Sequence, residues 1–142
     1  MNEQCWMYNG KCLEEPPSGV YGFIYCITDD TGKRYWGKKA FTHKSKTKLS
    51  KKARVGTRKR FNIGTKDSKW MNYWGSCKPL LEYIKLLGNT KGFKREIIKI
   101  CNDRSSLAYW EVAILIQNDV LFRSDSWNGN VCAKYFKGKI HK

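Results

Sequence analysis

The stretch Phe23-Ile24-Tyr25-Cys26-Ile27-Thr28, followed after a short gap by Gly32-Lys33-Arg34-Tyr35-Trp36-Gly37-Lys38-Lys39, decides the expected fold. Both runs are rich in aromatic and β-branched residues, which favour strands. Between them, Asp29-Asp30-Thr31-Gly32 has the composition of a tight turn. We therefore predict a β-hairpin with strands at about 20–28 and 33–37. Tyr25 and Tyr35 are expected at equivalent ends of the two strands, so the hairpin would present a pair of phenols.

The whole chain is strongly basic. Its 142 residues include 28 Lys+Arg and 12 Asp+Glu, which gives a formal net charge of +16. This length suits one compact domain, and the charge predicts a polyanionic partner, with nucleic acid favoured over an anionic membrane surface. No apolar run approaches the ~18 residues of a membrane-spanning helix, and the polar start does not resemble a signal peptide. We expect no membrane insertion and a cytoplasmic location.

The basic charge is concentrated in one segment. From Lys33 to Lys66 there are fourteen Lys or Arg residues and no Asp or Glu. A block of like charges repels itself, which predicts a solvated loop, but the same block can contact DNA phosphates and become ordered on binding. We favour DNA contact because no acidic residue neutralises the segment, and both descriptions can hold together. The residues expected to contact DNA are Lys38, Lys39, Lys44, Lys46, Lys48, Lys51, Lys52, Arg54 and Lys59.

Two helices and a third strand are expected after the basic segment. Pro79 suits the first turn of a helix, and an apolar stripe continues to a stop at Gly88. Residues 93–100 are short and rich in β-branched residues toward their end, which predicts a strand. Ser105 and Ser106 offer an N-cap for a second helix that runs to about residue 120.

These elements predict an α/β (α+β) fold in which a small three-stranded antiparallel sheet is flanked by helices. Residues 1–19 are expected to form an irregular N-terminal arm. Residues 20–142 are expected to form a single domain that carries the basic insertion at about 38–69.

Glu111 is the only acid in the helical stretch from Leu107 to Asn118. Leu107 and Leu115 lie four residues to either side of it, so helical periodicity places Glu111 beside the apolar stripe. A carboxylate withdrawn from water needs a cation, a hydrogen-bond donor or a metal ion. A boundary glutamate that reaches solvent or pairs with one lysine is the ordinary interpretation. Beside a tyrosine pair and a basic segment, we favour an oxygen ligand for Mg²⁺ or Mn²⁺.

The six cysteines fit neither a disulfide framework nor a zinc site well. There is no Cys-x-x-Cys pair, and His43 and His141 are remote from any cysteine. In a cytosolic protein we expect most of these thiols to be small buried apolar groups. Cys5 and Cys12 are the pair best spaced for a structural metal.

Together these features resemble the GIY-YIG nucleases, over roughly residues 20–130. Phe23-Ile24-Tyr25 stands at the first motif and Tyr35-Trp36-Gly37 at the second, with Phe23 in place of the motif's glycine and Trp36 in place of its isoleucine. Residues 93–100 resemble the third strand of the family, and Asn128 resembles a late asparagine that supports the pocket. The chain looks most like the small stand-alone phage members related to homing endonucleases, which act in the host cytoplasm. This likeness rests on the run Trp70-x-x-Tyr73-Trp74-Gly75-Ser76 and on the basic insertion.

The resemblance implies metal-dependent hydrolysis of DNA phosphodiester bonds. It implies that Glu111 binds one Mg²⁺ and that Tyr35 or Tyr25 accepts a proton from the attacking water. A tyrosinate base requires cationic surroundings, which the neighbouring lysines would supply. The resemblance also implies supporting roles for Gly37 and Asn128.

The catalytic arginine of the family is harder to assign. It follows the second motif on a helix, but here the basic insertion separates that motif from the next clear helix. Arg54, Arg58 and Arg60 all qualify by position, and we favour Arg58 or Arg60.

The expected partner is DNA, in double-stranded form. One site would nick one strand, whereas cutting both strands takes two sites, as in a homodimer, or two events. The alternative from another class is a non-catalytic basic nucleic-acid-binding protein, whose 14% aromatic residues would stack on bases. DNA binding without Mg²⁺-dependent cleavage would favour that alternative.

Overall fold

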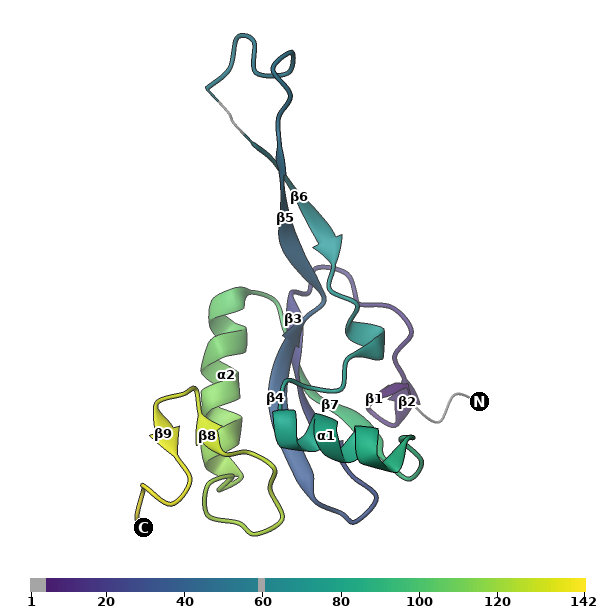
Figure 1. Cartoon of the computed structure of the whole chain (residues 1–142), viewed down its shortest axis with the longest axis vertical. Coiled ribbons are helices and arrows are strands. Elements are labelled where there is room, and N and C mark those ends of the chain that lie inside the picture. The colour runs from purple at the N-terminus through teal and green to yellow at the C-terminus, as the bar shows by residue number, and fades with distance from the viewer. Residues whose placement is uncertain (1–4, 59–60) are drawn as a thin grey trace.

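The computed structural model describes residues 5–58 and 61–142, and a mixed five-stranded sheet forms its centre (Figure 1). The strand order is β2-β1-β7-β3-β4, so β4 is an edge strand. The sheet is larger than the three antiparallel strands that the sequence predicts, although the mixed α/β class is confirmed. Its strands are β1 (Trp6–Tyr8), β2 (Lys11–Cys12), β3 (Gly22–Thr28), β4 (Arg34–Ala40) and β7 (Lys94–Cys101).

The predicted hairpin is present as β3 and β4. The Asp29 carboxylate accepts hydrogen bonds from the backbone N–H groups of Thr31 and Lys33 at 2.8 and 3.0 Å, which stabilises the turn. The register pairs Tyr25 with Gly37 and Ile27 with Tyr35. The two tyrosines therefore lie on the same face but two residues apart along the hairpin, and not at equivalent strand ends as the sequence suggested.

The two extra strands come from the segment predicted to be an irregular arm. β1 runs parallel to β7, and β2 pairs antiparallel with β1. Trp6 explains this placement, because its side chain is fully buried and its indole N–H donates to the Trp70 carbonyl at 2.7 Å. Cys5 and Cys12, the pair considered for a structural metal, instead form a disulfide across the β1–β2 turn. Cys26 and Cys101 are buried thiols, as predicted.

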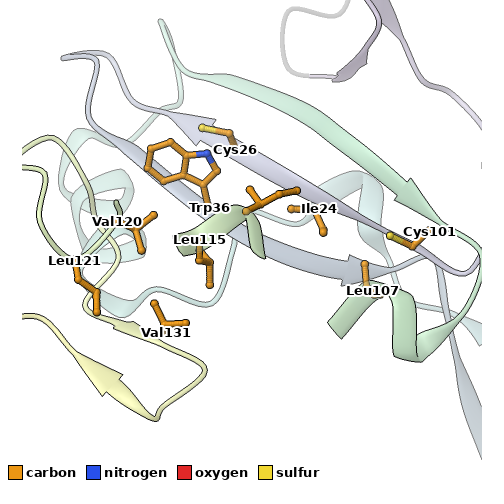
Figure 2. Close-up of a cluster of buried hydrophobic side chains, with 10 residues drawn as sticks. Ile24, Cys26, Trp36, Cys101, Leu107, Leu115, Val120, Leu121 and Val131 are labelled. Atoms are coloured by element: carbon orange, nitrogen blue, oxygen red, sulfur yellow. The ribbon is translucent and has the colours of Figure 1, made fainter. Parts of the chain in front are cut away.

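Two helices cover the two faces of the sheet. Helix α2 (Arg104–Gln117) packs on the face that carries Ile24 and Trp36, as Figure 2 shows. Helix α1 (Lys78–Leu87) and the short 3₁₀ helix η1 (Trp70–Asn72) pack on the opposite face. Alternation along β3 divides the residues between the layers: Ile24 and Cys26 face α2, whereas Phe23, Tyr25 and Ile27 face α1.

The helix boundaries agree with the sequence at three of four ends. Helix α1 begins at Lys78 with Pro79 in its first turn, and Gly88 ends it in the left-handed conformation at φ 75°. Helix α2 ends near the predicted residue. Its N-cap, however, is Asp103 and not a serine, because the Asp103 carboxylate accepts from the backbone N–H of Ser106 at 2.7 Å.

The basic insertion contains a two-stranded ribbon. Strands β5 (Thr42–Lys48) and β6 (Phe61–Asp67) pair antiparallel and project away from the five-stranded sheet (Figure 1). The insertion predicted as a solvated loop is therefore a β-ribbon at its base. A third small sheet joins β8 (Asn130–Val131) to β9 (Tyr135–Phe136) near the C-terminus. Within the described part of the chain, neither helix combines the length and the hydropathy needed to span a bilayer.

Candidate active site

A cavity of about 480 Å³ opens beside edge strand β4. Because β4 has no neighbouring strand on this side, α1 from one face of the sheet and α2 from the other both reach the cavity. Segments far apart in the sequence therefore meet there. Its polar lining includes Tyr35 from β4, Ser76 from the segment before α1, Lys78 from the first turn of α1, Glu111 from α2, and Asn128 and Cys132 from the C-terminal segment.

Tyr35 is the tyrosine that reaches the cavity. Its hydroxyl lies 3.4 Å from the Ser76 Oγ, and its ring packs on Gly75. Gly75 has φ +90°, and a Cβ built there would lie 3.1 Å from the ring, so this close approach requires glycine. Burial is the main cause that raises the pKa of Tyr35 above 10.0. The phenol is therefore protonated at neutral pH.

Tyr25 lies beneath Tyr35 and not in the cavity lining. Its side chain is 1% exposed, and the two ring centroids are 6.1 Å apart. A Cβ on Gly37 would lie 2.5 Å from the Tyr25 hydroxyl, which explains the glycine at this position. Burial again is the main cause that raises the pKa of Tyr25, here well above 10.0. The expectation that nearby cations lower the pKa of the tyrosines is therefore wrong, because desolvation dominates.

Glu111 projects from α2 into the cavity. Its side chain is 16% exposed, and its Oε1 lies 3.7 Å from the Nζ of Lys38 and 3.7 Å from the Sγ of Cys132. The helical pattern placed this carboxylate beside the apolar stripe, and the structure puts it at the boundary between that stripe and the cavity. The charge of Lys38 compensates the partly buried carboxylate.

Lys38 and Lys39 point to opposite faces of β4. The ammonium of Lys38 pairs with Glu111, whereas that of Lys39 lies 4.3 Å from the ring centroid of Tyr73. The sequence predicted DNA contacts for both. Strand alternation separates them, so only Lys38 lies beside the cavity lining.

The Asn128 side chain bonds to the backbone of edge strand β4 at a position where a neighbouring strand would otherwise pair. Its Oδ1 accepts from the Trp36 backbone N–H at 3.0 Å, and its Nδ2 donates to the Trp36 carbonyl at 2.8 Å. The side chain is buried, and Ser126 Oγ accepts from the Asn128 backbone N–H at 3.0 Å. These bonds tie the C-terminal segment to the centre of β4, next to Tyr35.

The arginines favoured by the sequence lie elsewhere or are not described. Arg58 is exposed in the loop between β5 and β6, and Arg60 falls outside the described residues. Arg54 donates from Nε to the Leu49 carbonyl at 3.0 Å. Within residues 5–58 and 61–142, the lining of the cavity includes no arginine.

Sequence reasoning did not single out Ser76, Lys78 or Cys132 as individual site residues. A signal for Ser76 was present, because it ends the run Trp70-x-x-Tyr73-Trp74-Gly75-Ser76, which directly precedes the first clear helix after the hairpin. No local pattern marks Lys78 as a site residue. Cys132 lies in a positive-φ turn, and nothing in the local pattern predicts its contact with Glu111.

Comparison with known families agrees with this geometry. The family model described as "Putative endonuclease segE, GIY-YIG domain" matches residues 6–140. Neither curated proteins nor solved structures gave a match. The matched range spans nearly the whole chain, including β1, the ribbon and the cavity. The chain therefore belongs to the GIY-YIG endonuclease family, and it is a nuclease that acts on DNA.

Proposed function

We propose that the cavity hydrolyses one phosphodiester bond of double-stranded DNA with the help of Mg²⁺ or Mn²⁺. The observation that carries this proposal is the meeting of Tyr35, from edge strand β4, and Glu111, from helix α2, in one cavity of about 480 Å³. The place of action is the cytoplasm of the cell that holds the DNA.

The residues at the cavity fit a Mg²⁺ site that the substrate completes. The described residues contain no group of three or more His, Cys, Asp or Glu side chains that could hold a metal. Mg²⁺ suits such a place, because it is commonly bound by one or two carboxylates plus waters and substrate phosphate oxygens. Glu111 would be the protein ligand, and the ion would supply charge stabilisation to the phosphate when bound.

Tyr35 has the position to handle the attacking water. A phenol that stays protonated acts as a relay: its oxygen accepts the water's proton while its own proton moves to the Ser76 oxygen at 3.4 Å. Ser76 is exposed, so its hydroxyl gives its own proton to a solvent water as it accepts the proton from Tyr35. Tyr25 positions this group from below, because its ring supports Tyr35 and its hydroxyl occupies the space over Gly37.

The ribbon and its loop would bind the DNA backbone outside the cavity. Lys44, Lys48 and Arg58 are exposed along this projection. Phosphate contacts by such residues supply affinity that is independent of base sequence. Of the other predicted contacts, Lys51, Lys52 and Arg54 lie in the described loop, the Lys46 side chain and Lys59 lie outside the described part of the molecule, and Lys38 and Lys39 lie on β4.

One cavity per chain cuts one strand. A double-strand break then requires a second chain, as in a homodimer, or a second binding event. Supercoiled plasmid separates these cases, because a nick produces relaxed circles and a paired cut produces linear DNA.

The test is plasmid cleavage by the wild-type protein and by Tyr35→Phe, with Mg²⁺, with Mn²⁺ and with EDTA. Removal of the relay hydroxyl should slow cleavage by about 10²-fold or more, by analogy with the loss of other general acid–base groups. Tyr109→Phe, an exposed tyrosine on α2, is the matched control and should cut at the wild-type rate. Undiminished cleavage in EDTA would refute the metal requirement, and binding without any cleavage would favour the non-catalytic alternative.

A further inference from the structure

We propose that Lys78 supplies the cationic contact to the phosphate that is cut, in the role expected of Arg58 or Arg60. The inference rests on the proposed function and adds a residue that touches the substrate. It follows from the position of Lys78 in the cavity and from the way the other cations there are engaged.

Contacts on both sides of Lys78 fix the backbone at the start of α1. The Tyr73 carbonyl accepts from the Arg95 guanidinium at 2.8 Å, and that guanidinium also lies 4.3 Å from the ring centroid of Trp74. Two residues after Lys78, the side chain of Leu80 is completely buried. The backbone of Lys78 is therefore held between two packed anchors. Its side chain is exposed, and the residue lines the same cavity as Tyr35 and Glu111.

The other lysines near the cavity already have partners. Lys38 pairs with Glu111 at 3.7 Å, and the ammonium of Lys33 lies 3.9 Å from the ring centroid of Trp127, another residue of the lining. Among the residues that the structure describes, Lys78 forms no salt bridge with an acid. Its ammonium is thus available to an incoming phosphate.

The surroundings of Lys78 add to its positive potential. Helix α1 has no acidic residue in its first turn, and its N-cap residue, Cys77, makes no side-chain capping hydrogen bond. The partial positive charge of a helix N-terminus is therefore not neutralised there by the protein. An ammonium in this position stabilises negative charge that builds on the phosphoryl oxygens.

Arg58, unlike Lys78, does not line the cavity. It lies in the loop at the far end of the ribbon, which projects away from both helices (Figure 1). From there it is placed to contact DNA outside the cavity.

The experiment compares Lys78→Gln and Lys78→Arg with the wild-type protein in single-turnover cleavage of duplex DNA at saturating protein with Mg²⁺. We expect Lys78→Gln to slow cleavage by about 10²-fold, as for loss of one charge-stabilising group, while the Kd for DNA changes by less than about threefold. Lys78→Arg should recover most of the rate because it restores the charge, which a purely structural role would not explain. Lys85→Gln, on the last turn of α1, is the matched control.

Two outcomes overturn the inference in distinguishable ways. If wild-type protein cuts and Lys78→Gln cuts equally fast, or if Arg58→Gln loses more rate than Lys78→Gln, the assignment of Lys78 is wrong and the proposed function stands. If wild-type protein cuts nothing with Mg²⁺ or Mn²⁺, the proposed function fails and the inference with it. Unchanged thermal unfolding of Lys78→Gln establishes that a slow variant is folded.

Discussion

The cavity at β4 and the β5–β6 ribbon differ in how their residues are held. At the cavity, Asn128 bonds to both backbone groups of Trp36, and Tyr25 fills the space beneath Tyr35. The ribbon has exposed lysines and is held by the pairing of its own two strands, which project from the sheet (Figure 1). An isolated two-stranded hairpin is only marginally stable in water. From this difference we expect the closely packed cavity to perform the reaction and the exposed, charged ribbon to bind the DNA.

This division has a measurable consequence. Substitutions at the cavity should lower the cleavage rate at saturating DNA, whereas substitutions on the ribbon should weaken DNA binding and reduce its dependence on salt.

Removal of the ribbon should give the largest effect on DNA binding. His43 and Lys66 face each other in the register, so an Asn-Gly turn can replace residues 44–65 between them. We expect DNA affinity at 100 mM salt to fall by about 10²-fold or more, because most of the phosphate contacts are lost. The urea midpoint of the remaining domain should be unchanged. A truncated protein that binds DNA as tightly as wild type would contradict the role of the ribbon.

Asn128→Ala should strongly weaken the cavity region. It leaves the N–H and C=O of Trp36 without their side-chain partners in a buried position, which costs roughly 3 kcal/mol of unfolding free energy. Urea denaturation measures this loss, and a reduced cleavage rate should accompany it. Asn89→Ala removes an exposed hydrogen bond to the Lys91 N–H and serves as the control, with an expected loss below about 1 kcal/mol. Equal losses in the two variants would contradict the account of β4.

A double substitution on the ribbon, Lys44→Gln with Lys48→Gln, should have an intermediate effect. Loss of two phosphate contacts should lower the slope of log K against log salt by about 2 and weaken binding severalfold. The cleavage rate at saturating protein should stay unchanged. Lys91→Gln with Lys139→Gln removes two lysines outside the ribbon and is the charge-matched control. A lower cleavage rate at saturation would show that the ribbon takes part in the reaction.

The smallest effect concerns stability at alkaline pH. Burial raises the pKa of Tyr25 in the folded protein above 10.0, so the unfolded chain loses this proton first as the pH rises. The stability that the protonated Tyr25 contributes is therefore fully present below pH 10 and is lost progressively as the pH rises toward the higher pKa of the folded state. Tyr25→Phe should show less alkaline loss in urea unfolding between pH 9 and 11 than wild type, whereas exposed Tyr109→Phe should behave as wild type. Parallel curves for Tyr25→Phe and wild type would contradict the burial of this hydroxyl.

Patterns within one element predicted the hairpin, the third strand and both helices. The turn at Asp29 and the end of α1 at Gly88 could be predicted because the geometry of each depends only on residues close to it in sequence. The same holds for Glu111, whose place beside the apolar stripe follows from helical periodicity. The family match over residues 6–140 confirms the resemblance that the two tyrosine motifs indicated.

Features that depend on distant partners were not predicted. The strand at Trp6–Tyr8 has only three residues and exists because Trp6 is buried against Phe23 and bonds to Trp70. Likewise, Lys78 lines the cavity because α1 and α2 approach β4 from opposite faces, which no local pattern contains. The pKa of Tyr35 was expected to be low because lysines are close in sequence, but burial, which depends on the whole fold, has the larger effect.

The most direct test of the account is the single-turnover cleavage rate of Glu111→Gln on duplex DNA in Mg²⁺, measured together with its Kd for the same DNA. Glu82→Gln, an exposed acid on α1, is the matched control. We predict that Glu111→Gln cuts about 10³-fold more slowly than wild type, because the carboxylate that would hold the ion is gone, while the Kd changes by less than about threefold. Cleavage by Glu111→Gln at the wild-type rate would contradict the placement of the reaction in the cavity beside β4.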